Sequence, residues 1–198
     1  MKTIYISFLL LISLSTTAQN EEARLETVTA FLNAQTASER ATYMSDDYRS
    51  YFDEKAGDGQ DKDSSLSDFR NWDEALHPRV TIIRYFPDKI LWETVKNTWT
   101  LYIKETNDFS NAIGFPGWDA KLLVTFNRRG KIKETVYMPS SKNELSYNSY
   151  LKPAIEWLQE HHPDEFRNVH ADGKLIKTKE SALKWIGLLA LWRKEAGR

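Results

Sequence analysis

One stretch of the sequence, WTLYIKETNDFSNAIGFPGWDAKLLVTFNRRGKIKETVYM (Trp99–Met138), decides the fold. Apolar and polar residues alternate within it over several runs, which is the period-2 pattern of β-strands. The predicted strands are Thr98–Phe109, Asp119–Asn127 and Lys131–Met138. We expect them to form most of a curved sheet, and we expect no helix between Thr98 and Val136.

The last two of these strands read as a hairpin around Arg128-Arg129-Gly130. Gly130 supplies the positive φ that a tight hairpin turn requires. Alternation along the final strand predicts one face made of Ile132, Glu134 and Val136, and an opposite face made of Lys133, Thr135 and Tyr137.

Two segments of this stretch resemble a known superfamily. FNRRGKIKETVYM (Phe126–Met138) is similar to the closing hairpin of the NTF2-like, or SnoaL-like, proteins, and DFSNAIGFPGW (Asp108–Trp118) resembles their loop before it. The resemblance spans about Leu25 to Met138. It implies an α+β cone, in which N-terminal helices roof a curved mixed or antiparallel sheet. It leaves function open, because this fold hosts isomerases, cyclases, dehydratases and non-catalytic binders.

Upstream of the sheet, the apolar spacing predicts helices, with Leu25, Val28, Phe31 and Leu32 forming one apolar stripe. The expected order is a helix Glu21–Gln35, a short helix Ser38–Met44, a solvated loop Asp53–Asp63, a helix from Ser64 or Ser65 to Leu76, and strands Val80–Phe86 and Ile90–Lys96.

Met1–Gln19 has the pattern of a secretory signal peptide: a charged Lys2, an apolar run and a small-residue cleavage region. We therefore expect an exported protein, periplasmic or secreted. The apolar run is too short to span a membrane, so we expect no stable membrane insertion after the signal is removed. The sequence has no Cys, which rules out disulfides and thiol chemistry.

The remaining chain divides into an expected NTF2-like domain, residues 20–139, and a C-terminal helical extension, residues 140–198, packed on or beside it. The extension should contain helices over Tyr147–Glu160 and Lys179–Ala196. The last helix is apolar nearly all round, which is typical of a buried helix. It should pack on the outer face of the sheet or on the preceding helix; the alternative is a surface for a partner or for a homodimer.

Charge and motifs exclude several classes of function. A net charge of -1 gives no general attraction to nucleic acid, and no phosphate-binding loop or serine nucleophile motif is present. The histidines have no spacing typical of a metal site. We predict no cofactor and no metal.

Enzymes of the superfamily that this chain resembles use an Asp or His base with a Tyr donor in an apolar pocket. Asp73 and His77, four residues apart on one predicted helix, are candidates for an oriented base, with Tyr51 as the donor. The resemblance places the family's base position at Phe52, one residue before Asp53. One step along an extended chain reverses the side chain, so this departure puts isomerase chemistry in doubt.

Aromatic residues are plentiful and are candidates for the walls of a pocket, although ordinary core packing would use them equally well. The expected lining is Tyr48, Trp72, Trp99, Phe115, Trp118 and Tyr137.

Three functions remain open on this basis. The first is binding, without turnover, of a small and largely apolar ligand or of a protein partner. The second is a lyase or isomerase that uses an Asp or His base and a Tyr donor on a cyclic substrate. The third is an assembly module that dimerises through the sheet or the last helix.

Overall fold

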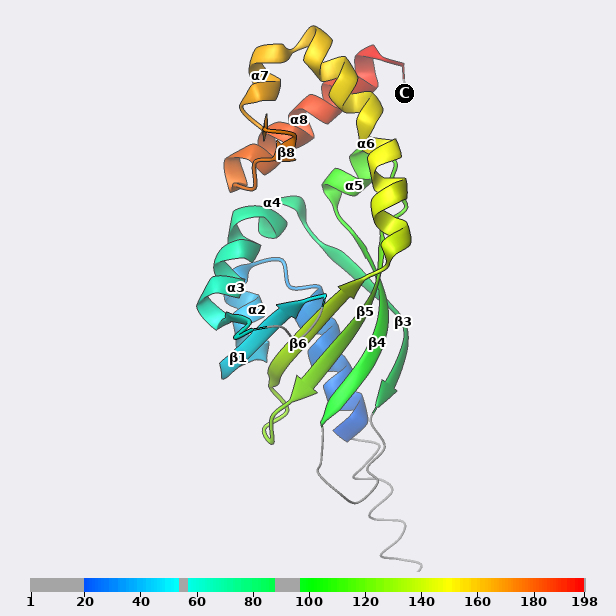
Figure 1. Ribbon diagram of the computed structural model, residues 1–198. Coiled ribbons are helices and arrows are strands. Elements are labelled where there is room, and N and C mark those ends of the chain that lie inside the picture. Colours follow the sequence, from blue (N-terminus) through cyan, green and yellow to red (C-terminus); the bar gives the residue numbers. More distant parts are fainter. Residues whose placement is uncertain (1–19, 54–56, 88–96, 198) are drawn as a thin grey trace, which may run out of the picture.

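The computed structural model describes residues 20–53, 57–87 and 97–197. It is built on a curved six-stranded sheet with helices against one face and at one end (Figure 1). The strands are β1 (Met44–Phe52), β2 (Gln60–Asp61), β3 (Arg79–Pro87), β4 (Thr98–Thr106), β5 (Trp118–Phe126) and β6 (Ile132–Pro139). The predicted strand Ile90–Lys96 and the segment Met1–Gln19 lie outside the described residues.

The strand order is β2-β1-β6-β5-β4-β3. β1 runs parallel to β6, whereas the other neighbouring strands are antiparallel, so the sheet is mixed. The expected α+β class with a curved sheet and N-terminal helices is confirmed.

β1 was not predicted as a strand. Its buried residues do not alternate: Met44 and Ser45 are buried together, and the pairing with β6 shifts between Met44 and Arg49. A bulged strand hides the period-2 signal, because side chains after the bulge change faces.

A second bulge changes the faces of β6. Thr125 pairs with Glu134 but Phe126 pairs with Ile132, so Lys133 is the extra residue. The predicted grouping of Ile132 with Glu134 and Val136 is therefore wrong. Ile132 packs in the same core cluster that Tyr137 contacts, because the bulge moves the later residues to the opposite face.

The expectation of no helix between Thr98 and Val136 is also wrong. β4 ends at Thr106, and the short helix α5 (Asp108–Ala112) follows it. Asn107 accepts a hydrogen bond from the backbone N–H of Ser110, whose hydroxyl accepts one from the N–H of Asn107. This capping box stabilises the helix start. Because α5 lies in the β4–β5 connection, the sheet itself is not interrupted.

The N-terminal helices cover one face of the sheet. A helix over residues 20–32 lies across it (blue in Figure 1), and it is followed by α2 (Ala37–Tyr43), α3 (Lys62–Asp68), the π-helical turn η1 (Phe69–Asp73) and α4 (Glu74–Leu76). α3 begins earlier than predicted, because Asp61 rather than Ser64 or Ser65 caps it. The core beneath these helices includes Phe31, Leu101 and Val124.

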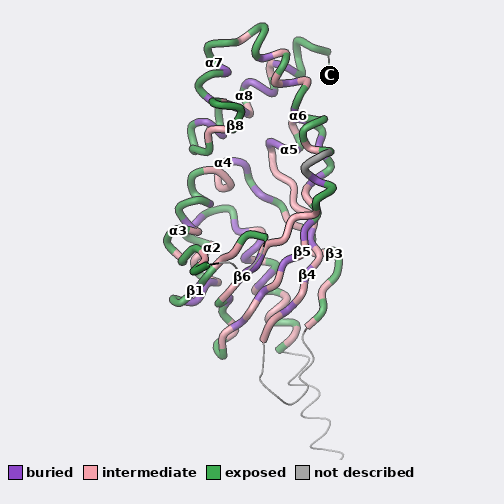
Figure 2. The backbone as a smooth tube through the Cα atoms, in the orientation of Figure 1, coloured by how far each residue is buried: buried purple, intermediate pink, exposed green. Residues whose placement is uncertain are grey.

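The C-terminal extension is α6 (Ser141–His161), α7 (Pro163–Arg167), the hairpin β7 (His170–Ala171) and β8 (Lys174–Leu175), and α8 (Lys179–Glu195). α8 packs against η1, α4, α5 and α6 at one end of the sheet, rather than on the outer face of the sheet. A second core forms there, in which Leu76 and Phe109 contact Leu158, Trp185 and Leu189. The purple segments of Figure 2 mark both cores.

Candidate functional site

Two adjoining cavities lie between the sheet and the helices that surround it. One, of about 540 Å³, is enclosed by the N-terminal helices and the sheet. The other, of about 480 Å³, lies between the sheet and the extension. Phe52, Asp73, Glu105 and Tyr137 line both. We therefore treat them as one joined cavity, with these residues at the junction.

The first cavity has aliphatic and aromatic walls with several polar and charged groups among them. Besides the junction residues, its lining includes Phe31, Arg40, Tyr48, Tyr51, Ser65, Phe69 and Thr135. These residues come from α2, β1, β6 and the helices that roof the sheet.

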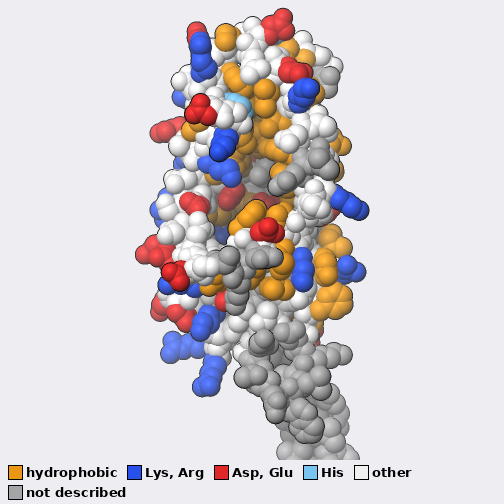
Figure 3. Space-filling model, viewed as in Figure 1, with side chains coloured by type: hydrophobic (Ala, Val, Ile, Leu, Met, Phe, Trp, Pro, Cys, Tyr) orange, Lys and Arg blue, Asp and Glu red, His pale blue; other side chains and the backbone are white. Residues whose placement is uncertain are grey.

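The second cavity is completed by the extension. Tyr147, Leu175 and Lys177 line it together with Trp72, Phe109 and Trp118. On the face drawn in Figure 3, the molecule is hollowed between the C-terminal helices and the sheet, and acidic side chains lie within the hollow. The extension is therefore part of the cavity wall.

Glu105 faces the cavity because of its position in β4. Trp99, Leu101 and Ile103 are all buried, and Glu105 is the next residue in this alternating series. Gly117 allows the chain after α5 to pass close by: a Cβ there would lie 2.7 Å from the Glu105 carbonyl oxygen. A carboxylate thus occupies the last position of an otherwise apolar face.

Both carboxyl groups at the junction have perturbed acidity. Burial raises the pKa of Glu105 to about 7, and the charge of Asp73 adds to this, while Arg40 opposes it. Burial also raises the pKa of Asp73, with Arg40 and Lys177 acting in the opposite direction. A carboxyl group with a pKa near neutrality can both donate and accept a proton at physiological pH.

The positive charge of Arg40 acts to lower the pKa of both carboxyl groups, but its guanidinium contacts other residues. It lies 4.0 Å from the ring centroid of Phe31 and 4.7 Å from that of Phe69. Its Nη1 donates to the Phe31 carbonyl oxygen at 3.3 Å. Among the described residues it forms no ion pair within 4.0 Å, and burial lowers its pKa.

Two tyrosines supply hydroxyl groups. Tyr48 is buried, and its hydroxyl shares a 2.6 Å hydrogen bond with the hydroxyl of Thr135. Burial raises the pKa of Tyr137, so this phenol stays protonated at physiological pH. Phe52 stacks on the Tyr137 ring with centroids 5.8 Å apart, and it is 72% exposed. Phe52 therefore marks the entrance of the cavity.

Of the residues predicted for the site, six line the joined cavity: Tyr48, Tyr51, Trp72, Asp73, Trp118 and Tyr137. Trp99 and Phe115 lie outside it. Trp99 stacks on Tyr85 within the sheet core, and Phe115 packs against Trp118 and residues of α6. Asp53 is exposed after the end of β1 and does not line the cavity.

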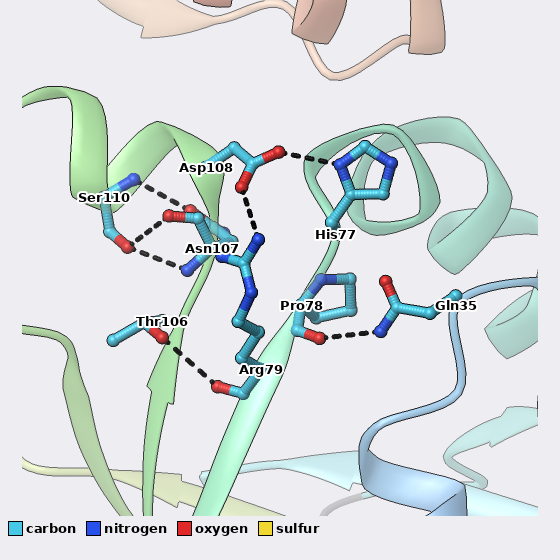
Figure 4. Close-up of polar contacts among 8 residues, drawn as sticks. All are labelled: Gln35, His77, Pro78, Arg79, Thr106, Asn107, Asp108 and Ser110. Atoms are coloured by element: carbon cyan, nitrogen blue, oxygen red, sulfur yellow. Dashed lines mark hydrogen bonds and ion pairs between the residues drawn. The ribbon is translucent and has the colours of Figure 1, made fainter.

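His77 is not paired with Asp73. The π-helical turn alters the spacing of side chains, α4 ends at Leu76, and His77 adopts a left-handed backbone with φ of 50°. Its Nδ1 donates to Asp108 at 2.7 Å, and Arg79 donates to the other carboxylate oxygen of Asp108 at 3.0 Å (Figure 4). Burial opposes the shift, but these bonds hold the pKa of Asp108 below its ordinary value. This network joins α4 to α5.

Glu105 and Arg40 were not among the predicted site residues. The signal for Glu105 was present, because a charged residue at an inward position of an apolar strand is unusual. Arg40 carried no such signal, since its helix has only one buried residue, Ala37.

The described residues contain no group of three or more side chains suited to a metal ion. Nor does any helix in the described part of the chain have the length and apolar character that spanning a membrane requires.

No protein-family model and no curated protein sequence matches this chain. Solved structures with a similar arrangement include an NTF2-like protein of unknown function from Cytophaga hutchinsonii, at 11% identity and a TM-score of 0.43, covering 62% of this chain and 94% of that one. Another is the pinacolase BvnE from Penicillium brevicompactum, at 9% identity and a TM-score of 0.49, covering 68% and 97%. A computationally designed 17-OHP binder is similar at 13% identity and a TM-score of 0.46, covering 61% and 95%. At these identities the similarity concerns the fold alone, and the architecture described above rests on the chain's own sheet and helices.

Proposed function

We propose that this protein binds a small, largely apolar molecule in the joined cavity. The observation that carries the proposal is the size and lining of that cavity, which joins two spaces of about 540 and 480 Å³ whose walls are mostly aliphatic and aromatic. Pockets of a few hundred Å³ with apolar walls and a few placed polar groups are the usual sites for small molecules.

The test is a thermal-shift screen of the mature protein against lipids and aromatic metabolites. A ligand at a hundred times its Kd stabilises the native state by about 2.7 kcal/mol, so a true ligand raises Tm in proportion to its concentration. The absence of any shift across the library would contradict the proposal.

A matched pair of variants places the binding in the cavity. Ser65 lines the first cavity, whereas Ser67, on the same helix, is exposed and does not line it. Ser65→Trp should fill the space and abolish the shift, while Ser67→Trp should leave it intact. Equal loss in both variants would argue against the cavity as the site.

The second candidate is an acid–base enzyme, a lyase or isomerase acting on a cyclic substrate. It is favoured by Glu105, whose pKa is raised to about 7, beside the protonated phenol of Tyr137. A base of this acidity suits proton abstraction next to a carbonyl group. The residues differ from the predicted set, since Glu105 takes the place of His77.

Proton exchange distinguishes an enzyme from a binder. Ligands from the screen are incubated with the protein in deuterium oxide, and the loss of carbon-bound protons is followed by NMR. Glu105→Gln should abolish exchange, whereas Glu160→Gln, at an exposed site on α6, should not. If the native protein binds a ligand without proton exchange, the enzyme proposal fails and only the binding function remains.

The location of the protein is part of the proposal. The signal-like pattern of Met1–Gln19 supports export to the periplasm or the medium. Mass spectrometry of the mature protein should find an N-terminus after Ala18 or Gln19; an intact Met1 on protein recovered from the cytosol would contradict it.

A further inference from the structure

The two carboxyl groups at the junction lack partners. Neither the carboxyl group of Asp73 nor that of Glu105 forms a hydrogen bond or an ion pair with another described residue, although both residues line the two cavities. Buried or half-buried carboxylates are ordinarily hydrogen-bonded or paired with a cation, because the unpaired charge is costly away from water. A pair of unpartnered acids facing one space therefore needs an explanation.

No cation among the described residues forms an ion pair within 4.0 Å with either carboxyl group, although the charge of Arg40 acts on both and that of Lys177 acts on Asp73. Arg40 is engaged by the Phe31 carbonyl oxygen and by two aromatic rings. Lys177 lines only the second cavity and forms no ion pair with another described residue. Arg40 and Lys177 thus line the cavity without forming an ion pair with either carboxyl group.

The walls around the junction suit an organic cation. Phe52 and Tyr137 lie at the junction itself, Tyr51 and Phe69 line the first cavity, and Trp72 lines the second. Aromatic faces attract ammonium groups through their negative π surface, which an uncharged ligand cannot use. A metal ion fits less well, because the described residues contain no cluster of three or more metal-ligating side chains.

We propose that the joined cavity binds an organic cation, an amine or a quaternary ammonium on an apolar body, with Glu105 and Asp73 as its counter-ions. The inference rests on the proposed function and names the class of ligand. The apolar body fills the aromatic part of the cavity, and the charged group lies at the junction.

The acidity of the site supports this assignment and sets its pH dependence. Glu105 has a pKa of about 7, raised by burial and by Asp73, and opposed by Arg40. The other charged groups that face the cavity are Asp68 and Lys177. Because only the ionised carboxylate attracts a cation, affinity should rise about tenfold from pH 6 to pH 8 as Glu105 loses its proton.

The test compares two probes of the same shape, phenylbutylamine, which is protonated in this range, and phenylbutanol, which is neutral. Calorimetric titration of the full-length mature protein should give at least tenfold tighter binding of the amine at pH 8. This preference should shrink at pH 6. The alcohol tests hydrogen bonding to the same carboxyl groups without charge.

Variants assign the preference to the junction. Glu105→Gln and Asp73→Asn keep the shape of the side chain, and each should weaken amine binding about tenfold while leaving the alcohol unchanged. Glu105→Gln should also remove the pH dependence. Glu160→Gln, on the exposed face of α6, is the matched control and should change neither probe.

The outcomes separate this inference from the proposed function. If the alcohol binds as tightly as the amine, or if the affinity for the alcohol rises as the pH falls, the ligand is not a cation. The proposal of a ligand-binding cavity would then still hold. If neither probe binds and the thermal-shift screen is also empty, both proposals fail. If both variants still bind the amine more tightly than the alcohol, the cation does not bind at these carboxyl groups, and the assignment is overturned.

Discussion

Individual side chains decide the chemistry of this cavity, and Glu105 is the most informative of them. It belongs to a strand face that is otherwise apolar, and the same burial that raises its pKa to about 7 also affects the stability of the fold. A carboxyl group whose pKa is higher in the folded state than in the unfolded state destabilises the folded state wherever the unfolded chain would be ionised.

Glu105→Gln should therefore stabilise the protein at alkaline pH. The destabilising effect begins as pH rises through the ordinary pKa of 4.5 and is complete above about 7. The variant should gain up to about 3 kcal/mol at pH 8 and almost nothing at pH 4. Urea unfolding at both pH values measures this, with Glu160→Gln as the control; an equal effect at both pH values would contradict the raised pKa.

The Tyr48–Thr135 pair tests a second polar contact in the cavity wall. Both residues are buried and their hydroxyl groups are 2.6 Å apart. Tyr48→Phe should lower the free energy of unfolding by about 1–2 kcal/mol, because it leaves the Thr135 hydroxyl without its partner.

A double-mutant cycle with Thr135→Val isolates the hydrogen bond. Once Thr135 is Val, Tyr48→Phe should cost much less. Tyr150→Phe, on an exposed part of α6, serves as the control. Purely additive effects would mean that the two hydroxyl groups do not interact.

At the level of secondary-structure elements, the connection between β4 and β5 positions Glu105 at the cavity. α5 begins at once after β4, and the returning chain passes the end of β4 at Gly117, which has φ of 112°. A side chain there would meet the Glu105 carbonyl oxygen at 2.7 Å and the Thr106 methyl carbon at 2.8 Å. Glycine at this position is thus a condition for the close approach of the two segments.

Two alanine substitutions separate backbone strain from crowding. Gly114 also has a positive φ, of 74°, but a Cβ there would meet open space. Gly114→Ala should cost about 1–2 kcal/mol from strain alone. Gly117→Ala should cost about 3 kcal/mol or more, because strain and collision add, and it should also weaken ligand binding by displacing Glu105. Equal costs for the two, measured by urea unfolding, would contradict the close approach.

For the molecule as a whole, the extension determines the shape of the second cavity. It shares a core with α4 and α5, in which Trp185 is fully buried and packs against Phe109 and Phe166. The indole N–H of Trp185 donates to the Val169 carbonyl oxygen at 3.0 Å. One side chain thus connects α8 to α5, α7 and the segment before β7.

Trp185→Ala should lower the free energy of unfolding by about 3–5 kcal/mol, the usual cost of removing a large buried aromatic residue. It should also weaken ligand binding, because Tyr147, Leu175 and Lys177 would no longer be held at the cavity. Leu183→Ala is the control, since Leu183 lies on the same helix and is 55% exposed. Undiminished ligand affinity in a destabilised Trp185→Ala protein would remove the second cavity from the site.

Much of the architecture was predictable from local patterns. Alternation placed β3, β4, β5 and β6 to within a few residues, apart from the end of β4, and α8 begins at Lys179 as predicted. The bulges in β1 and β6 were not predictable, because an extra residue in one strand leaves no signature in that strand's own sequence. The π-helical turn was missed for a similar reason, and with it the separation of His77 from Asp73.

Local sequence specified the strands, the helices and the α+β class of this chain, because alternation, apolar stripes and caps act over a few neighbouring residues. The tertiary structure decided the site. Glu105, Asp73, Tyr137 and Phe52 come from β4, η1, β6 and β1, and only the packing of these elements brings them around one space. The acidity of Glu105 also depends on that packing, because burial and the charges of Asp73 and Arg40 are properties of a neighbourhood assembled from distant parts of the chain.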